Sequence, residues 1–135
     1  MTNVVLQMQE LAGGYGGGQV LNGVTLQLHA AEVLGLIGRN GVGKTTLMRT
    51  LIGVVPAKQG QILLGEIDIT QASPQRRARL GIGYVPQGRE VFTGLTVSEN
   101  LQVGMQFVRE HREFAKEMLD RVLDYFPILR QRLKQ

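Results

Sequence analysis

The chain has 135 residues, no cysteine and a formal net charge of +4. The length suffices for one domain with a hydrophobic core, and the lack of cysteine excludes a disulfide framework and a thiolate metal site. No apolar run approaches the roughly 20 residues that span a bilayer, and residues 1–9 lack the features of a signal peptide, so we expect a cytoplasmic chain.

The positive charge follows no recognisable motif. Basic residues, among them Arg76, Arg77, Arg79 and Arg121, are spread over the second half of the sequence. No aromatic residues are interleaved with them, and no helix-turn-helix, zinc-finger or RNA-binding pattern is present. We therefore interpret the arginines as parts of solvated helix faces rather than as an anion-binding patch, and we predict no nucleic-acid partner.

Two strands are predicted near the N-terminus. Residues 4–9 alternate partly between apolar and polar side chains, and residues 20–28 contain a clean alternation at 24–28. Residues 13–18 between them are glycines apart from Tyr15, which predicts a flexible turn that carries one aromatic ring. Residues 29–32 then form a tight link to the next segment.

A phosphate-binding loop (P-loop) follows. Residues 32–37 are a short apolar run of buried-strand type, and residues 46–52 have apolar side chains at helical spacing before Gly53. Between them the sequence fits the pattern G-x-x-x-x-G-K-[ST] at every fixed position. The loop and its first helical turn are Gly38, Arg39, Asn40, Gly41, Val42, Gly43, Lys44, Thr45 and Thr46. A chance glycine turn before Lys-Thr is the alternative, and the flanking strand and helix argue against it.

The residue types of this loop suit a polyphosphate. We expect its three glycines to adopt positive φ angles, so that backbone N–H groups can turn inward around an anion. A helix that begins near Lys44 adds further N–H groups and the positive end of its dipole. Lys44 is expected to reach the β and γ phosphates, Thr45 to coordinate Mg²⁺, and Thr46 to support the first turn.

The remaining sequence changes from strands to helices. A loop at 54–60, a strand at 61–64, a turn at 65–66, a short capped helix at 73–80 and a buried strand at 82–85 are predicted in that order. Thr96 and Glu99 form a capping box that opens a helix continuing through Val108. A second helical stripe follows, and Pro127 separates it from a last helical pattern at 128–133. The stripe consists of Phe114, Met118, Val122 and Tyr125.

The order of these motifs resembles the ATP-binding subunits of ABC transporters. Tyr15 matches the family's adenine-stacking position, and residues 83–87, Gly-Tyr-Val-Pro-Gln, resemble its Q-loop. More narrowly, residues 84–92, 95–101 and 126–129 resemble the ATP-binding subunits of branched-chain amino-acid and urea importers, and the P-loop leans toward the urea branch. The resemblance extends over essentially the whole chain.

The resemblance implies specific roles. Tyr15 would stack on adenine, the alternative being a tyrosine that packs over a glycine turn. The P-loop residues would hold Mg-ATP, with Lys44 and Gln87 taking part in catalysis and Thr45 and Gln87 contacting the metal. The segment Arg89-Glu90-Val91-Phe92 would lie near the groove for the membrane subunit, or equally would be a solvated loop.

The implied fold is α/β: a P-loop NTPase core of the ABC type, with N-terminal antiparallel strands and the start of the α-helical subdomain, in truncated form. Residues 1–95 would form the nucleotide-binding core with the P-loop and Q-loop, and residues 96–135 the beginning of the helical subdomain. The implied partners are transmembrane permease subunits and a second ATP-binding subunit. The implied location is the inner face of the plasma membrane.

Several family motifs are not found in these residues. The signature sequence, the Walker B strand with its glutamate and the switch histidine follow the helical segment in the family, and neither Asp68 nor Asp124 closes the apolar run of a Walker B strand. We therefore expect an N-terminal part that binds ATP without efficient hydrolysis and, with an uncovered sheet edge, self-associates. A non-catalytic nucleotide-binding module stays open; a GTPase is not supported, because no N-K-x-D sequence is present. The transported solute is not specified.

Overall fold

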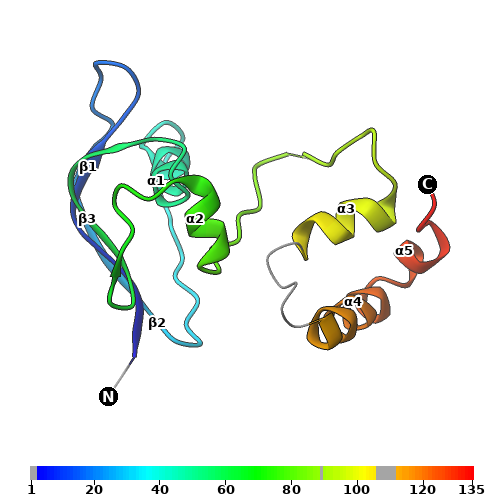
Figure 1. Ribbon diagram of the computed structural model, residues 1–135. Helices are drawn as coiled ribbons and strands as arrows, with labels where there is room; N and C mark the ends of the chain where they lie inside the picture. Colours follow the sequence, from blue (N-terminus) through cyan, green and yellow to red (C-terminus); the bar gives the residue numbers. More distant parts are fainter. Residues whose placement is uncertain (1–2, 89, 106–111) are drawn as a thin grey trace. The chain divides into compact units, whose positions relative to one another are not determined.

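The computed structural model describes residues 3–88, 90–105 and 112–135. These residues form two compact units, Met1–Gly83 and Tyr84–Gln135, each described separately below (Figure 1). The sequence predicts a functional boundary at residue 95. That boundary differs from the division between these two units, and it stays a prediction. Within the described residues, no helix is long and apolar enough to cross a lipid bilayer.

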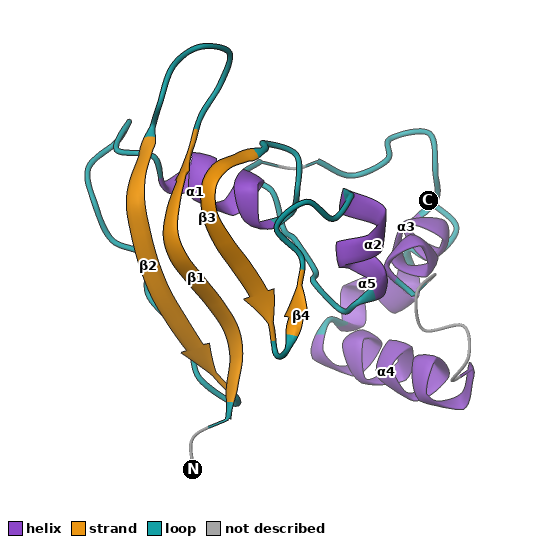
Figure 2. Cartoon of the chain, turned by 60° about the vertical axis from the view of Figure 1, so that its left-hand side comes forward, coloured by secondary structure: helices purple, strands orange, loops and turns teal. Residues whose placement is uncertain are grey.

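The first unit is built on an antiparallel sheet with strand order β2-β1-β3-β4 (Figure 2). The predicted N-terminal strands are confirmed, and Leu6 of β1 pairs with Leu28 on one side and Leu64 on the other. The third strand begins at Ala57, earlier than predicted, because the loop-like sequence there pairs with the end of β1. The strands are β1 Val4–Gly13, β2 Leu21–His29, β3 Ala57–Leu64 and β4 Ile67–Asp68.

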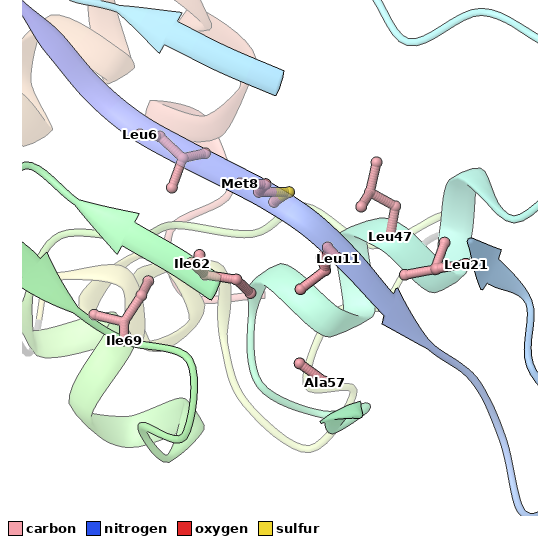
Figure 3. Close-up of a cluster of buried hydrophobic side chains, with 8 residues drawn as sticks. All are labelled: Leu6, Met8, Leu11, Leu21, Leu47, Ala57, Ile62 and Ile69. Carbon is pink, nitrogen blue, oxygen red and sulfur yellow. The ribbon is translucent and has the colours of Figure 1, made fainter. Parts of the chain in front are cut away.

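A hydrophobic cluster joins this sheet to helix α1, Lys44–Leu51 (Figure 3). Alternating side chains of β1 point to one face of the sheet, so Leu6 and Met8 enter the cluster together, and Leu47 of α1 packs into it. Full burial of one such side chain stabilises the fold by about 1.5–3 kcal/mol. The cluster therefore fixes α1, and with it the P-loop, on the sheet. Its members are Leu6, Met8, Leu11, Leu21, Leu47, Ala57, Ile62 and Ile69.

Helix α2, Pro74–Arg79, confirms the predicted short helix with its proline in the first turn. The Ser73 side chain accepts a hydrogen bond from the Arg76 N–H, which caps the helix. Arg77 differs from the expectation of a solvated arginine, because only 3% of it is exposed. Its guanidinium lies among backbone carbonyls and ties α2 to the end of α1.

Two strand predictions are wrong. Residues 32–37 and 82–85 are not in strands, and Val33 and Ile37 are 97% and 95% exposed. A strand requires a neighbour to complete its backbone hydrogen bonds, and the described strands pair only with one another. These apolar residues are of the types found in buried strands, but no strand in the described residues pairs with them.

The second unit is helical. It contains α3 Val97–Gly104, α4 Arg112–Tyr125 and α5 Pro127–Gln131. The predicted capping box is confirmed: Thr96 accepts from the Glu99 N–H, and the Glu99 carboxylate accepts from the Thr96 N–H. The Thr96 N–H and hydroxyl both donate to the Glu99 carboxylate at 2.8 Å, and these two bonds lower the pKa of the Glu99 carboxyl. The first N–H groups of α3, those of Val97 and Ser98, donate to carbonyls of the C-terminal residues.

The stripe predicted on α4 is only partly buried. Phe114 and Tyr125 are 52% and 71% exposed, whereas Leu123 is buried. The buried face of the helix is thus displaced from the predicted one. The preceding helix, predicted to continue through Val108, ends at Gly104 with Met105 as its C-cap, and Val108 lies outside the described residues.

Candidate functional site

The P-loop leads directly into α1. Gly41 and Gly43 have φ angles of 82° and 103°, as predicted, and Gly43 is the N-cap of the helix. Gly38 does not share the positive φ. A Cβ atom at Gly38 would instead lie 3.0 Å from the Val42 side chain, so this glycine provides space for the curl of the loop. The predicted positive φ is therefore confirmed at Gly41 and Gly43 and is wrong at Gly38.

Lys44 holds its ammonium group over this loop. The Lys44 Nζ donates to the carbonyl oxygens of Gly38 at 2.6 Å and Arg39 at 2.7 Å. An ammonium has three N–H donors, so two of them brace the loop in this arrangement. The group is thereby placed beside the start of α1, where an anion would meet both the ammonium charge and the helix dipole.

The other loop residues differ in exposure. Arg39, Asn40, Val42 and Thr45 are exposed, so they are accessible to a ligand. Thr46 is buried, and its carbonyl accepts a hydrogen bond of 2.9 Å from the Thr50 hydroxyl. This position suits the predicted support of the first helical turn. Direct contacts of these residues with phosphate or metal stay predictions.

The donor set fits a metal-bound polyphosphate. The loop offers backbone N–H groups at a helix start, one ammonium and the exposed Thr45 hydroxyl, and the first turn of α1 contains no acidic residue that would repel an anion. Within the described residues, no three His, Cys, Asp or Glu side chains could hold a metal ion by themselves. Magnesium that is already bound to phosphate oxygens needs few protein ligands, so a polyphosphate could bring the metal to a site without such a cluster.

Tyr15 lies in the glycine turn between β1 and β2, with 48% of the residue exposed. Its hydroxyl accepts a 3.3 Å hydrogen bond from Nη1 of Arg49, which belongs to α1. Lys58 of β3 donates to carbonyls of the same turn. Arg49 and Lys58 are not predictable from the sequence, because no local pattern connects residues so far apart in the chain.

Gln87 is exposed and belongs to the second unit, so its approach to a nucleotide stays a prediction. Beside it in sequence, Arg89 lies outside the described residues. The following residues border a mostly apolar pocket of about 690 Å³ within the second unit. Its lining includes Glu90, Val91, Phe92, Leu95, Val97, Leu101, Val103 and Leu129.

Asn100 shapes one wall of this pocket. Its side-chain amide accepts from the Phe92 N–H at 2.9 Å and donates to the carbonyls of Phe92, Leu95 and Thr96. The two N–H groups of the amide are shared among these three carbonyls, and together with the bond that the amide oxygen accepts they hold the 92–96 loop against α3. Phe92, at 57% exposure, is thus presented by an ordered loop.

The carboxyl of Asp68 has a structural role in the β3–β4 hairpin. It accepts a 2.6 Å hydrogen bond from the Thr70 hydroxyl and a 2.7 Å bond from the Gln61 amide. Together with the Thr70 N–H, these donors lower the pKa of Asp68 to about 2. The carboxylate is therefore occupied by its neighbours, which agrees with the expectation that Asp68 does not act as a Walker B aspartate.

The family model described as "ABC transporter" matches residues 21–133. Among solved structures, the chain superimposes on one described as "Structure of ATP binding subunit of ABC transporter", with a TM-score of 0.85 and 27% identity. That superposition covers 97% of this chain and 53% of the other. The match includes both described units.

Curated relatives point the same way. A "Probable ABC transporter ATP-binding protein" of Azorhizobium caulinodans is 42% identical over 87% of this chain and 42% of the relative. The "Probable branched-chain amino acid transport ATP-binding protein LivF" of Archaeoglobus fulgidus is 35% identical over 97% of this chain and 55% of the relative. The "Lipopolysaccharide export system ATP-binding protein LptB" of Escherichia coli K12 is 40% identical over 75% of this chain and 42% of the relative. The chain thus spans roughly half the length of these relatives.

Proposed function

The chain belongs to the ABC transporter family, and from this premise we propose that residues 38–46 bind the triphosphate of Mg-ATP for a transport complex. The observation that carries the proposal is the curled loop that ends at Gly43, with the Lys44 ammonium over it and α1 beginning at Lys44. The arrangement concentrates positive charge and N–H donors at one point. A polyphosphate is the ligand that uses all of these donors.

Each side chain of the site has a proposed role. The Lys44 ammonium exchanges its carbonyl contacts at Gly38 and Arg39 for β and γ phosphate oxygens. The Thr45 hydroxyl orients toward Mg²⁺, which neutralises charge on the phosphates. The Tyr15 ring offers a surface for the adenine, and Gln87 takes part in arranging metal and water.

For the 135 residues themselves, we propose nucleotide binding with little turnover. Phosphoryl transfer to water requires positioning of the water and metal as well as the phosphates, and the described site supplies the phosphate contacts. A non-catalytic nucleotide-binding module is the second candidate. Both candidates, nucleotide binding with little turnover and a non-catalytic module, predict negligible ATP turnover by the purified chain. A steady-state ATPase assay therefore distinguishes them from an active ATPase.

The binding proposal is tested by calorimetric titration of Mg-ATP into the wild-type chain and a Lys44→Ala variant. We expect the variant to bind on the order of tenfold more weakly or worse, since a charge-assisted contact to phosphate is lost. Lys134→Ala, a substitution at an exposed lysine of the second unit, is the matched control and should bind like wild type. Equal affinity of Lys44→Ala and wild type would refute the proposed site.

We further propose a permease subunit as the occupant of the apolar pocket in the second unit, with the whole protein peripheral to the inner membrane face. Phe92 and Val91 are exposed at its border, and Asn100 orders the loop that carries Phe92. Exposed apolar side chains around a pocket are typical of a protein contact. An assembled transporter in which this pocket faces solvent would contradict the assignment.

For the transported solute, we propose a branched-chain amino acid or urea. The run at residues 84–101 resembles that subgroup, and similarity to the Archaeoglobus relative supports it. Similarity to a lipopolysaccharide export protein keeps export as the rival. Cells without the gene should lose uptake of radiolabelled leucine or urea, and the intact gene, but not its Lys44→Ala form, should restore it. Normal uptake of both solutes would contradict the importer assignment.

A further inference from the structure

We propose that Arg49 and Lys58 are positioning residues for nucleobase binding, which fix the glycine turn and the Tyr15 ring relative to the P-loop. The inference rests on the proposed function, because it assigns the adenine surface to Tyr15. Three observations carry it: the closed base of the turn, two contacts from Lys58 and one contact from Arg49. All lie in the first unit.

The base of the turn is closed by its own backbone. The Val20 N–H donates to the Gly13 carbonyl at 2.8 Å, and the Gly18 N–H donates to the Tyr15 carbonyl at 3.0 Å. Gly14 allows this closure, since a Cβ atom there would overlap the Gly18 carbonyl. The turn is therefore a defined loop at the end of the β1–β2 hairpin (Figure 2), and its remaining freedom lies at its tip.

Lys58 holds that tip from the neighbouring strand. It follows Ala57, which pairs with Gly13 at the end of β1, so its side chain begins beside the turn. The Lys58 ammonium donates to the carbonyls of Gly16 and Gly18, each at 3.3 Å. These two carbonyls lie on either side of the tip, so one charged group restrains both, and charge-assisted hydrogen bonds are stronger than neutral ones.

Arg49 connects the Tyr15 ring to the helix that follows the P-loop. It lies in α1, the helix that begins at Lys44, and its Nη1 donates to the Tyr15 hydroxyl at 3.3 Å. The P-loop also lies close to the end of the turn, because a Cβ built at Gly43 would stand 3.1 Å from the Val20 side chain. The helix that starts at the phosphate loop therefore also sets the position of the aromatic ring.

A ring held in place before the ligand arrives costs less entropy to order on binding. Loss of either restraint should therefore weaken the contribution of the adenine and leave that of the phosphates unchanged. Inorganic tripolyphosphate separates the two, since it carries the phosphate chain without a base. A merely structural role of Arg49 or Lys58 would change the affinity for both ligands alike.

The test titrates Mg-ATP and Mg-tripolyphosphate into wild type, Lys58→Met and Arg49→Met. We expect each variant to bind ATP about threefold to tenfold more weakly, the effect of one or two lost hydrogen bonds, and to bind tripolyphosphate as wild type does. Tyr15→Phe keeps the ring and removes the hydroxyl that accepts from Arg49, so it should also weaken ATP binding and leave tripolyphosphate binding unchanged. In the double variant, Arg49→Met should cost less than it does alone, since the shared contact is already lost. Lys116→Met, at an exposed lysine of the second unit, should bind both ligands normally.

Equal losses for both ligands, or no loss for either, would overturn the inference. If Lys58→Met unfolds, Tyr15→Phe still decides the Arg49 contact and Lys58→Gln the Lys58 contact. The Lys44→Ala variant separates this inference from the proposed function. If Lys44→Ala binds neither ligand while Lys58→Met and Arg49→Met bind ATP normally, the proposed phosphate site stands and only this inference fails. If wild type binds neither ligand, both fail.

Discussion

Arg77 places a guanidinium group in the interior of the first unit. Its Nη1 donates to the carbonyls of Thr50 and Leu51 at 2.7 Å each, at the C-terminal end of α1. The Nε and Nη2 atoms donate to Ala72 and Thr70 between β4 and α2. Burial lowers the pKa of Arg77, while the negative end of the α1 dipole favours the charge. One side chain thus donates to four carbonyls, of which that of Thr50 also accepts from the Gly53 N–H.

Replacement of Arg77 by Met should destabilise the first unit by about 3 kcal/mol, because buried carbonyls lose their donors. Arg77→Lys should recover only part of the loss, since a single ammonium cannot reproduce the planar fork of the guanidinium. Arg79→Met is the matched control, because Arg79 is exposed on the same helix, and it should change stability by less than about 0.5 kcal/mol. Urea unfolding monitored by circular dichroism measures all three; equal effects of Arg77→Met and Arg79→Met would contradict the capping role.

The distance between partners along the chain decides which single residues sequence reasoning could find. Lys44 and the loop carbonyls that it contacts lie within one short motif, so their proximity was predictable. Arg77 and Thr50 are 27 residues apart, and Arg49 and Tyr15 are 34 apart. Nothing local in the sequence connects those pairs, and Arg77 was consequently expected on a solvated helix face.

At the scale of elements, helix starts could be predicted because their caps are local. Ser73 with Pro74 and Thr96 with Glu99 each place the signal within four residues of the helix start, and both helices begin where expected. Helix α1 likewise begins at Lys44, as the P-loop pattern predicted. The hydrogen bonds that stabilise these helix starts lie within one helical turn.

Strands depend on partners elsewhere in the chain, and this explains the errors of strand prediction. Residues 57–60 look like a loop but belong to β3, because they pair with the end of β1 across a bulge. Only glycine fits position 60 there, with a φ of 83° and the Gln9 carbonyl where a Cβ would stand. Residues 32–37 have strand-like side chains and no pairing partner in the described chain, so they stay outside the sheet.

At the scale of the whole molecule, apolar surface is distributed unevenly. The hydrophobic cluster belongs entirely to the first unit, where β1, β3 and α1 enclose it. Yet Val33 in that unit and Val85 in the second are 97% and 91% exposed, each within an apolar segment that forms no strand. Contiguous exposed apolar segments favour contact with other protein surfaces, and strand-like sequences outside any sheet favour strand pairing between copies.

We therefore expect the isolated chain to self-associate in a manner that depends on these two segments. A double variant, Val33→Lys with Val85→Lys, should shift the population toward monomer, because each lysine adds charge where two copies would pair. Val54→Lys is the matched control: Val54 is also exposed, at 59%, but lies outside both segments, so it should associate as wild type does. Light scattering over a concentration series measures the mass of each. A wild-type chain that stays monomeric throughout, or a Val54→Lys variant that dissociates as readily as the double variant, would show that these segments do not drive association.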